Sequence, residues 1–175
     1  MRLKLFVGVI IFFGLSVCAS ALNAGTVKQN PVDLILYQLD INNEHVLRDG
    51  TIAVDQALPI QQKLKLLLDE ISHRHYSDRT PIEILKTEKT KEGFIVTINL
   101  KETEQDFYQS KWYQSFQGST GGQETFVQLV YTPLQPDYPG FWFAGIKVLW
   151  NGRPIEELDH IDLTGVKYRG KMEKV

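Results

Sequence analysis

Hydrophobic and polar positions along the chain predict strands and helices in alternation. Four segments have the apolar content and length of strands, namely 32–39, 82–87, 94–100 and 144–150. Two shorter extended pieces, 45–47 and 51–54, flank Asp49-Gly50. The first helix is predicted from apolar residues at helical spacing, which are Ile60, Leu64, Leu67, Leu68 and Ile71. The second is predicted from Ser119 or Thr120 to just before Pro133, with a buried face of Phe126, Val127 and Val130.

The resulting order of strand, helix, strand, strand, helix and strand predicts an α+β fold. We expect one mixed or antiparallel sheet with two helices packed on one face. In 94–100 the apolar residues share one face while Thr97 and Asn99 take the other, so we expect one face to meet water. Asn151-Gly152 is a strong hairpin signal. The domain is predicted to span 32–168, with a frayed tail at 169–175.

The first residues have the pattern of an export signal. Arg2 and Lys4 precede an apolar run of 13 residues, 5–17, which is typical of a signal peptide and shorter than a membrane span. Ala19-Ser20-Ala21 fits the cleavage pattern of small residues. We therefore expect a signal peptide at 1–21 cleaved after Ala21, a linker at 22–31, and a periplasmic or otherwise extracytoplasmic protein. An uncleaved anchor is the alternative.

Cys18, the one cysteine of the chain, raises the question of lipidation. Leu15-Ser16-Val17-Cys18 is similar to a bacterial lipobox, in which the cysteine carries the lipid. The residue before that cysteine is normally small, and Val17 is not. We expect Cys18 to leave with the signal peptide, and a lipid anchor at Cys18 is the alternative. Contact with the membrane is expected only through the export signal or through a lipid anchor at Cys18.

Composition excludes several classes of function. The chain has 19 Lys and Arg against 21 Asp and Glu, for a net charge of −2 and no basic block, which argues against nucleic-acid binding. A single cysteine rules out a disulfide framework and a cysteine-based zinc cluster. We expect no cofactor.

Across roughly residues 32–165 the chain resembles the GerMN domain of sporulation and spore-germination proteins. The resemblance rests on the order and spacing of several segments, which are Leu34-Ile35-Leu36-Tyr37, the 64–71 helix, Gly93 to Leu100, Gly118-Ser119, Val130-Tyr131-Thr132, and Ile146 to Trp150 before Asn151-Gly152-Arg153. The sequence departs from that family at Asn99, where an acidic residue is usual, and in the longer aromatic loop 133–140. The resemblance implies a single-copy, non-catalytic part of bacterial envelope machinery that acts through protein contacts or peptidoglycan.

Three polar motifs have a chemical and a structural interpretation. His73 and His75, with Asp78 nearby, would diverge on a helix, so we interpret them as helix-end residues rather than metal ligands. Asp159-His160-x-Asp162 lacks a third histidine at metal spacing and is interpreted as a solvated turn. The glycine-rich segment 118–122 lacks the ending of a P-loop and is interpreted as a helix start. We therefore predict no catalytic residue and no metal site.

Aromatic residues give the best candidate for a binding surface. Six of them lie in two polar or proline-rich segments without core periodicity, and these are Trp112, Tyr113, Phe116, Tyr138, Phe141 and Trp142. Aromatic residues on loops are enriched at protein interfaces and can also stack on sugar rings. Packing over the sheet is the alternative for the same residues.

Two functions of different class follow. The favoured one is an exported, non-catalytic interaction domain of the cell envelope, whose partner is an envelope protein or peptidoglycan. The alternative is a small periplasmic hydrolase or glycan-binding protein that uses the aromatic loops with carboxylates such as Asp106 or Asp137. A deep cleft that joins His160, Asp162 and another carboxylate would favour the hydrolase.

Overall fold

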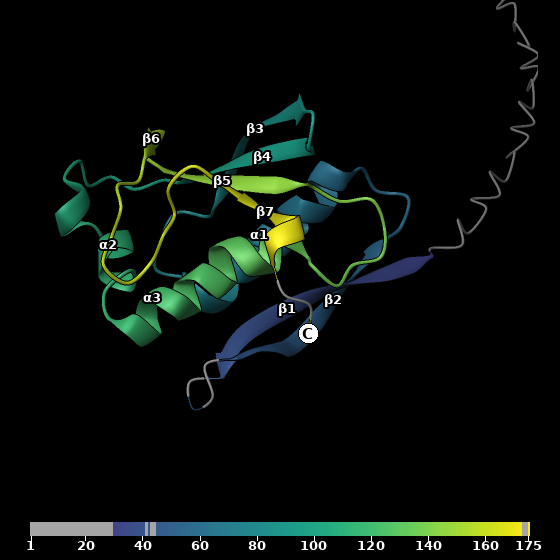
Figure 1. Ribbon diagram of the computed structural model, residues 1–175, viewed down its shortest axis with the longest axis horizontal. Coiled ribbons are helices and arrows are strands. Elements are labelled where there is room, and N and C mark those ends of the chain that lie inside the picture. The colour runs from purple at the N-terminus through teal and green to yellow at the C-terminus, as the bar shows by residue number, and fades with distance from the viewer. Residues whose placement is uncertain (1–29, 41, 43–44, 173–174) are drawn as a thin grey trace, which may run out of the picture.

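The computed structural model describes residues 30–40, 42, 45–172 and 175 (Figure 1). The signal peptide at 1–21, its cleavage at Ala21, the lipidation of Cys18 and nearly all of the 22–31 linker lie outside the described residues. Within them, no helix has the length and apolar character needed to cross a bilayer.

The larger of the two sheets that the described residues form has five strands. β3 (Glu83–Thr90) and β4 (Gly93–Leu100) form an antiparallel hairpin, and β4 pairs in parallel with β5 (Gly145–Trp150). Two short strands then pair with β5 in antiparallel fashion, and these are β6 (Arg153–Pro154) and β7 (Val166–Tyr168). The strands predicted at 82–87, 94–100 and 144–150 are thus present.

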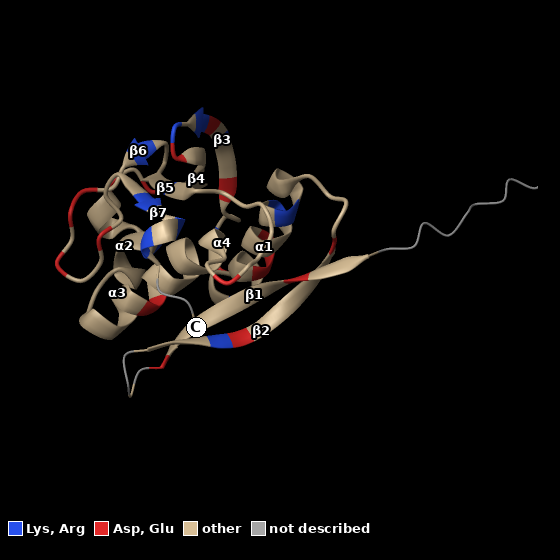
Figure 2. Cartoon of the chain, turned by 45° about the vertical axis from the view of Figure 1, so that its right-hand side comes forward, with Lys and Arg blue, Asp and Glu red and all other residues tan. Residues whose placement is uncertain are grey.

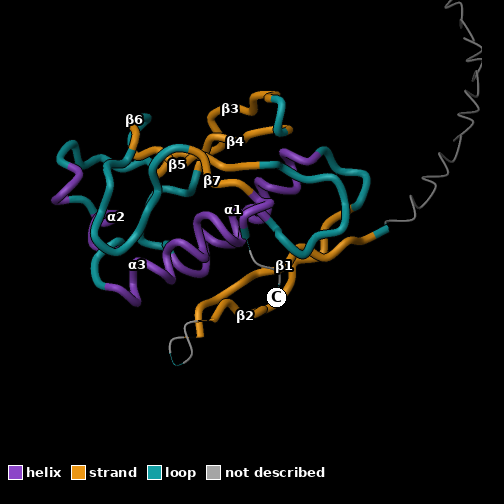
Figure 3. The backbone as a smooth tube through the Cα atoms, in the orientation of Figure 1, coloured by secondary structure: helices purple, strands orange, loops and turns teal. Residues whose placement is uncertain are grey.

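Two helical segments cover one face of this sheet (Figure 3). α1 (Ile60–His75) buries the predicted face of leucines and isoleucines, because those side chains recur on one side of the helix. α3 (Ser119–Phe126) continues through a π-helical turn, η2 (Val127–Tyr131), into α4 (Thr132–Leu134). The second helix therefore does not stop before Pro133. The wider π turn comes just before this residue, which has no N–H to donate, and the helix ends at Gln135 in the left-handed conformation.

The first strands form a second sheet of their own. β1 (Pro31–Asp40) pairs along its length with β2 (His45–Asp55), so the two extended pieces predicted around Asp49-Gly50 are one strand with a bulge. This ribbon lies on the far side of the helices from the five-stranded sheet (Figure 1). The α+β class is confirmed, but the strands divide between two sheets instead of one, with the helical layer between them.

The helical layer buries side chains from both β layers in one core. Leu34 and Leu36 of β1, Leu67 and Leu68 of α1, and the inner residues of β4 and β5 belong to the same cluster. On the outer face of the sheet, Thr97 and Asn99 are buried as well, contrary to the expectation that they meet water. Asn99 donates to Glu83 Oε2 at 3.3 Å and accepts from the Gly152 N–H at 2.8 Å, so β3 and the turn after β5 provide its partners.

Two short helices and the C-terminal segment complete the fold. The predicted aromatic insertion contains η1 (Phe107–Gln109) and α2 (Lys111–Ser115). The segment predicted as a tail begins with the turn η3 (Arg169–Lys171). Arg169 donates from Nε and Nη2 to the Gln135 carbonyl at 3.1 and 2.9 Å, so this part of the tail packs on the domain.

Candidate functional site

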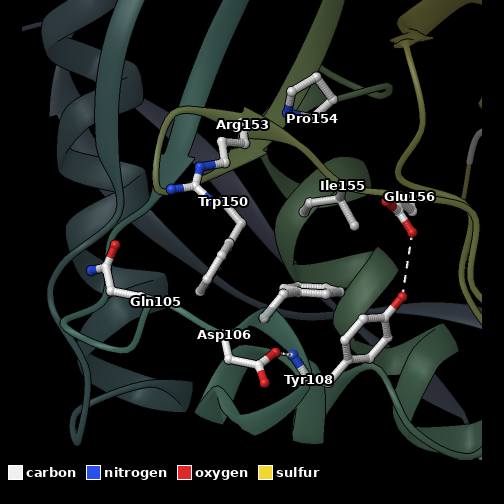
Figure 4. A pocket seen from close by; sticks show the side chains of 9 residues that line it. Gln105, Asp106, Tyr108, Trp150, Arg153, Pro154, Ile155 and Glu156 are labelled. Carbon is white, nitrogen blue, oxygen red and sulfur yellow. Dashed lines mark hydrogen bonds between the residues drawn. The ribbon is translucent and has the colours of Figure 1, made fainter.

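A groove of about 530 Å³ opens beside the end of β5 (Figure 4). One wall is the segment that leads into η1, and the other is the chain that turns back after β5. Its lining residues are Gln105, Asp106, Phe107, Tyr108, Trp150, Arg153, Pro154, Ile155 and Glu156. We call this the η1–β6 groove.

Asn151 holds the two walls of the groove together. Asn151 and Gly152 have φ angles of 45° and 75°, as a type I′ hairpin turn requires, and this turn brings Arg153 to Glu156 back past β5. The Asn151 side chain accepts from the Glu102 N–H at 2.8 Å and donates to the Glu104 carbonyl at 2.9 Å. One turn residue thus fixes the position of the η1 segment relative to β6.

Acidic side chains shape the η1 wall through backbone hydrogen bonds. Glu104 Oε1 accepts from the N–H groups of Asp106 and Gln105 at 2.9 and 2.7 Å, and these bonds lower the pKa of Glu104. Asp106 caps η1 by accepting from the Tyr108 N–H at 3.0 Å. Figure 2 shows that acidic residues gather on the loops around α2, at this end of the molecule. These hydrogen bonds hold the turn that places Phe107 and Tyr108 at the groove.

Tyr108 stands at the rim of the groove and bridges its walls. Its side chain is 53% exposed, and its hydroxyl donates to Glu156 Oε2 at 3.3 Å across the opening (Figure 4). The charge of Glu156 raises the pKa of Tyr108. The Tyr108 ring packs against Tyr113 with their centroids 5.0 Å apart.

Aromatic rings also form the floor. Phe107 meets Trp150 edge to face with their centroids 5.2 Å apart, and it contacts Tyr113 and Phe116 behind it. Trp150 is only 4% exposed, and its indole N–H has no hydrogen-bond partner among the described residues. A buried donor without a partner is unusual in a folded protein, and here it belongs to a residue that lines a cavity.

The six predicted binding residues divide between the core and two separate surfaces. Trp112, Phe116 and Trp142 are buried in the core, so these three side chains pack inside the domain and do not form a surface. Tyr113 is half-buried behind Tyr108 at the η1–β6 groove. Tyr138 and Phe141 belong to the 136–143 loop, which borders a different cavity of about 660 Å³. The two aromatic loops do not form one site.

The aromatic residues of the loop 136–143 differ in exposure. Trp142 points inward and its indole N–H donates to the Pro133 carbonyl at 2.8 Å. Phe141, the next residue, is 70% exposed and touches Phe94 only edge to face. Phe143, the residue after Trp142, is buried as well, so exposure does not simply alternate along this loop.

The histidine motifs do not converge on a metal centre. No group of three His, Cys, Asp or Glu side chains in the described part of the chain is placed to hold a metal ion. His75 Nδ1 lies 3.2 Å from Gln128 Nε2, and partial removal of the ring from water lowers the pKa of His75. His160 and Asp162 line a cavity of about 290 Å³ whose described lining includes no further carboxylate. The cleft that would favour the hydrolase over the interaction domain is not formed there.

Sequence reasoning missed most of the groove. Arg153, Ile155 and Glu156 were assigned no role, although the Asn151-Gly152 turn indicates that the chain after it returns along β5. The pairing of Tyr108 with Glu156 joins residues 48 positions apart and has no local signal. Asp106, the carboxylate named for the alternative function, lies in the groove, whereas Asp137 binds Tyr37 and Arg48 elsewhere.

Comparison with known proteins leaves the family open. No family model matches the chain, and no curated protein matches it. Among solved structures the chain is similar to one described as a "putative lipoprotein" from Clostridium perfringens, with 16% identity, a TM-score of 0.35, and coverage of 80% of this chain and 89% of that chain. The resemblance to GerMN domains stays a prediction.

Proposed function

We propose that the protein is an exported, non-catalytic interaction domain of the bacterial cell envelope, which acts in the assembly of envelope or sporulation machinery as GerMN-like proteins do. Its partner is an envelope protein or peptidoglycan. The observation that carries the proposal is the η1–β6 groove, in which an exposed tyrosine and a buried tryptophan face polar side chains. Aromatic anchors surrounded by polar groups are the usual chemistry of a recognition site.

The predicted export and the cleavage of the signal peptide are tested on the native protein. Intact mass or N-terminal sequencing of the chain from its own cells should give a mature protein that begins at Leu22, without lipid. A mature chain that begins with a diacylated Cys18 would show that the protein is anchored to the membrane by a lipid. A full-length chain in the cytoplasm would contradict the proposal.

The contact is tested by photocrosslinking at two matched positions. A photoreactive residue replaces Tyr108 in one variant and Phe141 in the other, because both side chains are exposed and aromatic but only Tyr108 lines the groove. We expect the variant at position 108 to crosslink to an envelope component in intact cells, and the variant at 141 to give much less product. Equal yields from the two positions would argue against the groove as the contact site.

One observation favours the alternative function, a small hydrolase. Asp106 and Glu156 line the same groove from opposite walls, and paired carboxylates are the usual machinery of glycoside hydrolysis. Both side chains are exposed, whereas an acid catalyst is generally held in a partly buried setting. Incubation with isolated peptidoglycan separates the two functions. The hydrolase releases soluble fragments and loses this activity in Asp106→Asn, while the interaction domain releases none.

The histidines provide a second test of the non-catalytic interpretation. The variant with His73→Ala, His75→Ala and His160→Ala removes the side chains of both histidine motifs. We expect it to fold and to support the envelope phenotype of the gene as the unchanged chain does. Loss of that phenotype in a folded variant would redirect the search to acid–base or metal chemistry.

A further inference from the structure

Three exposed side chains of the η1–β6 groove keep hydrogen-bonding capacity that the described residues do not use. They provide the whole Arg153 guanidinium, Asp106 Oδ2 and Glu156 Oε1. The guanidinium only donates and the two carboxylate oxygens only accept. A ligand that fits the groove must therefore offer both acceptors and donors.

The charges of the groove argue against a strongly charged ligand. Asp106 and Glu156 stand on opposite walls and would repel an anion, while Arg153 stands on β6 and would repel a cation (Figure 4). Arg153 forms no ion pair within the described part of the chain, so its charge is available to the groove. A neutral ligand with several hydroxyl groups satisfies all three polar groups without a charge conflict.

The walls of the groove also carry flat apolar surface. Phe107, Tyr108 and Trp150 supply aromatic surface, and Pro154 with Ile155 supplies aliphatic surface. A sugar ring presents a C–H face that packs on such surfaces and an equatorial rim of hydroxyls that both donate and accept. The cavity of about 530 Å³ falls within the range that encloses a small organic ligand.

We propose that the η1–β6 groove binds a neutral saccharide, with a sugar ring against Tyr108 and Trp150 and its hydroxyls on Arg153, Asp106 and Glu156. This assignment names the ligand class of the groove and rests on the proposed function, in which the same groove makes the envelope contact. It selects a glycan partner over a protein partner.

Titration calorimetry of the purified chain with tetra-N-acetylchitotetraose and with cellotetraose tests the assignment. At least one of these probes should bind saturably, and Tyr108→Ala should weaken that binding at least tenfold. Arg153→Ala, a change at an exposed position that leaves the core untouched, should weaken it by about fivefold, because it removes the donors that face the saccharide hydroxyls. Phe141→Ala, an exposed aromatic outside the groove, should change it less than twofold.

Several results would overturn the assignment. Absence of binding to both saccharides at about 10 mM would do so, as would binding that Tyr108→Ala and Arg153→Ala leave unchanged. Pentalysine and inorganic phosphate are the charged probes, and groove-dependent binding of either without saccharide binding would mean a charged ligand.

Failure of the saccharide assignment can be told apart from failure of the proposed function. If no saccharide binds while position 108 still crosslinks to an envelope component, the ligand class is wrong and the interaction domain stands. If a saccharide binds in the groove but the chain is not exported, the site stands and the envelope function falls.

Discussion

The side-chain amide of Gln135 takes the position beside Ile35 that a neighbouring strand would occupy. Its Oε1 accepts from the Ile35 N–H at 2.8 Å, and its Nε2 donates to the Ile35 carbonyl at 2.5 Å. Gln135 is fully buried and lies at the end of α4. A single side chain thus satisfies both backbone groups that β1 presents to the helical layer at this residue.

The same arrangement continues along β1 at every second residue. The Tyr37 N–H donates to Thr132 Oγ1 at 3.3 Å, and the Leu39 N–H donates to Glu124 Oε2 at 2.8 Å. A strand edge with unpaired N–H groups invites pairing with other chains. Side chains of the second helix cover this edge and fix the ribbon on the helical layer.

We expect Gln135→Ala to destabilise the fold by about 2–4 kcal/mol, because it leaves the buried N–H and carbonyl of Ile35 without partners. Reversible urea unfolding measures the change. Gln123→Ala, an exposed glutamine on α3, is the matched control and should cost less than about 0.5 kcal/mol.

Gln135→Gly separates the hydrogen bonds from the backbone conformation. Gln135 has a φ of 48°, which glycine adopts without a steric penalty, so this variant should be more stable than Gln135→Ala by up to about 1 kcal/mol. An unfolding free energy of Gln135→Ala within about 0.5 kcal/mol of the unchanged chain would contradict the role of the amide.

The two leucines Leu66 and Leu67 test the buried face of α1. Leu67 is fully buried in the core and Leu66 is 44% exposed. Leu67→Ala should cost about 2–5 kcal/mol through lost transfer energy and the cavity that remains, and Leu66→Ala less than about 1 kcal/mol. Urea unfolding of both variants checks the difference, and similar losses would mean that the face of the helix is wrongly assigned.

The neighbouring aromatics of the 136–143 loop should behave in opposite ways. Trp142→Ala empties a buried site and breaks the hydrogen bond to the Pro133 carbonyl, so we expect a loss of about 3–5 kcal/mol. Phe141→Ala removes an exposed ring and should cost less than about 1 kcal/mol. Thermal melting of each variant measures the effect, and the reverse order of stability would contradict the placement of this loop.

Asp162 predicts a pH-dependent contribution to stability. Its hydrogen bonds to Lys167 Nζ at 2.5 Å and to Thr164 lower the pKa of its carboxyl to about 2. Because the folded pKa lies below the unfolded one, this stabilisation is present above about pH 4 and is lost as the pH falls toward 2. The side chain is exposed, so Asp162→Asn should cost at most about 1 kcal/mol at pH 7.

Urea unfolding of the Asp162→Asn variant and the unchanged chain at pH 7, 4 and 2 measures this effect. The difference between the two should shrink between pH 4 and 2 and vanish near the lower value. A carboxyl NMR titration of Asp162 supplies an independent value, and a pKa near 4 in the folded chain would refute the role of Lys167.

Local sequence determined the elements whose signals lie within a few residues. Apolar residues at helical spacing define α1, and Asn151-Gly152 defines the turn after β5, because only residues with positive φ form that hairpin. The strands β1, β3, β4 and β5 were likewise predicted to within a few residues at either end. These features depend on backbone geometry and on the contrast between apolar and polar side chains, which neighbouring residues carry.

Only the tertiary structure decided how these elements meet. The separation of β1 from the main sheet depends on Gln135, Thr132 and Glu124, which lie 85 to 100 residues away along the chain. The groove depends on Tyr108 and Glu156, and the burial of Trp142 beside an exposed Phe141 depends on the contact of the loop with Pro133 at the end of the second helix. Hydrogen bonds and packing between distant residues form only when the chain is compact, so no local pattern of residues specifies them.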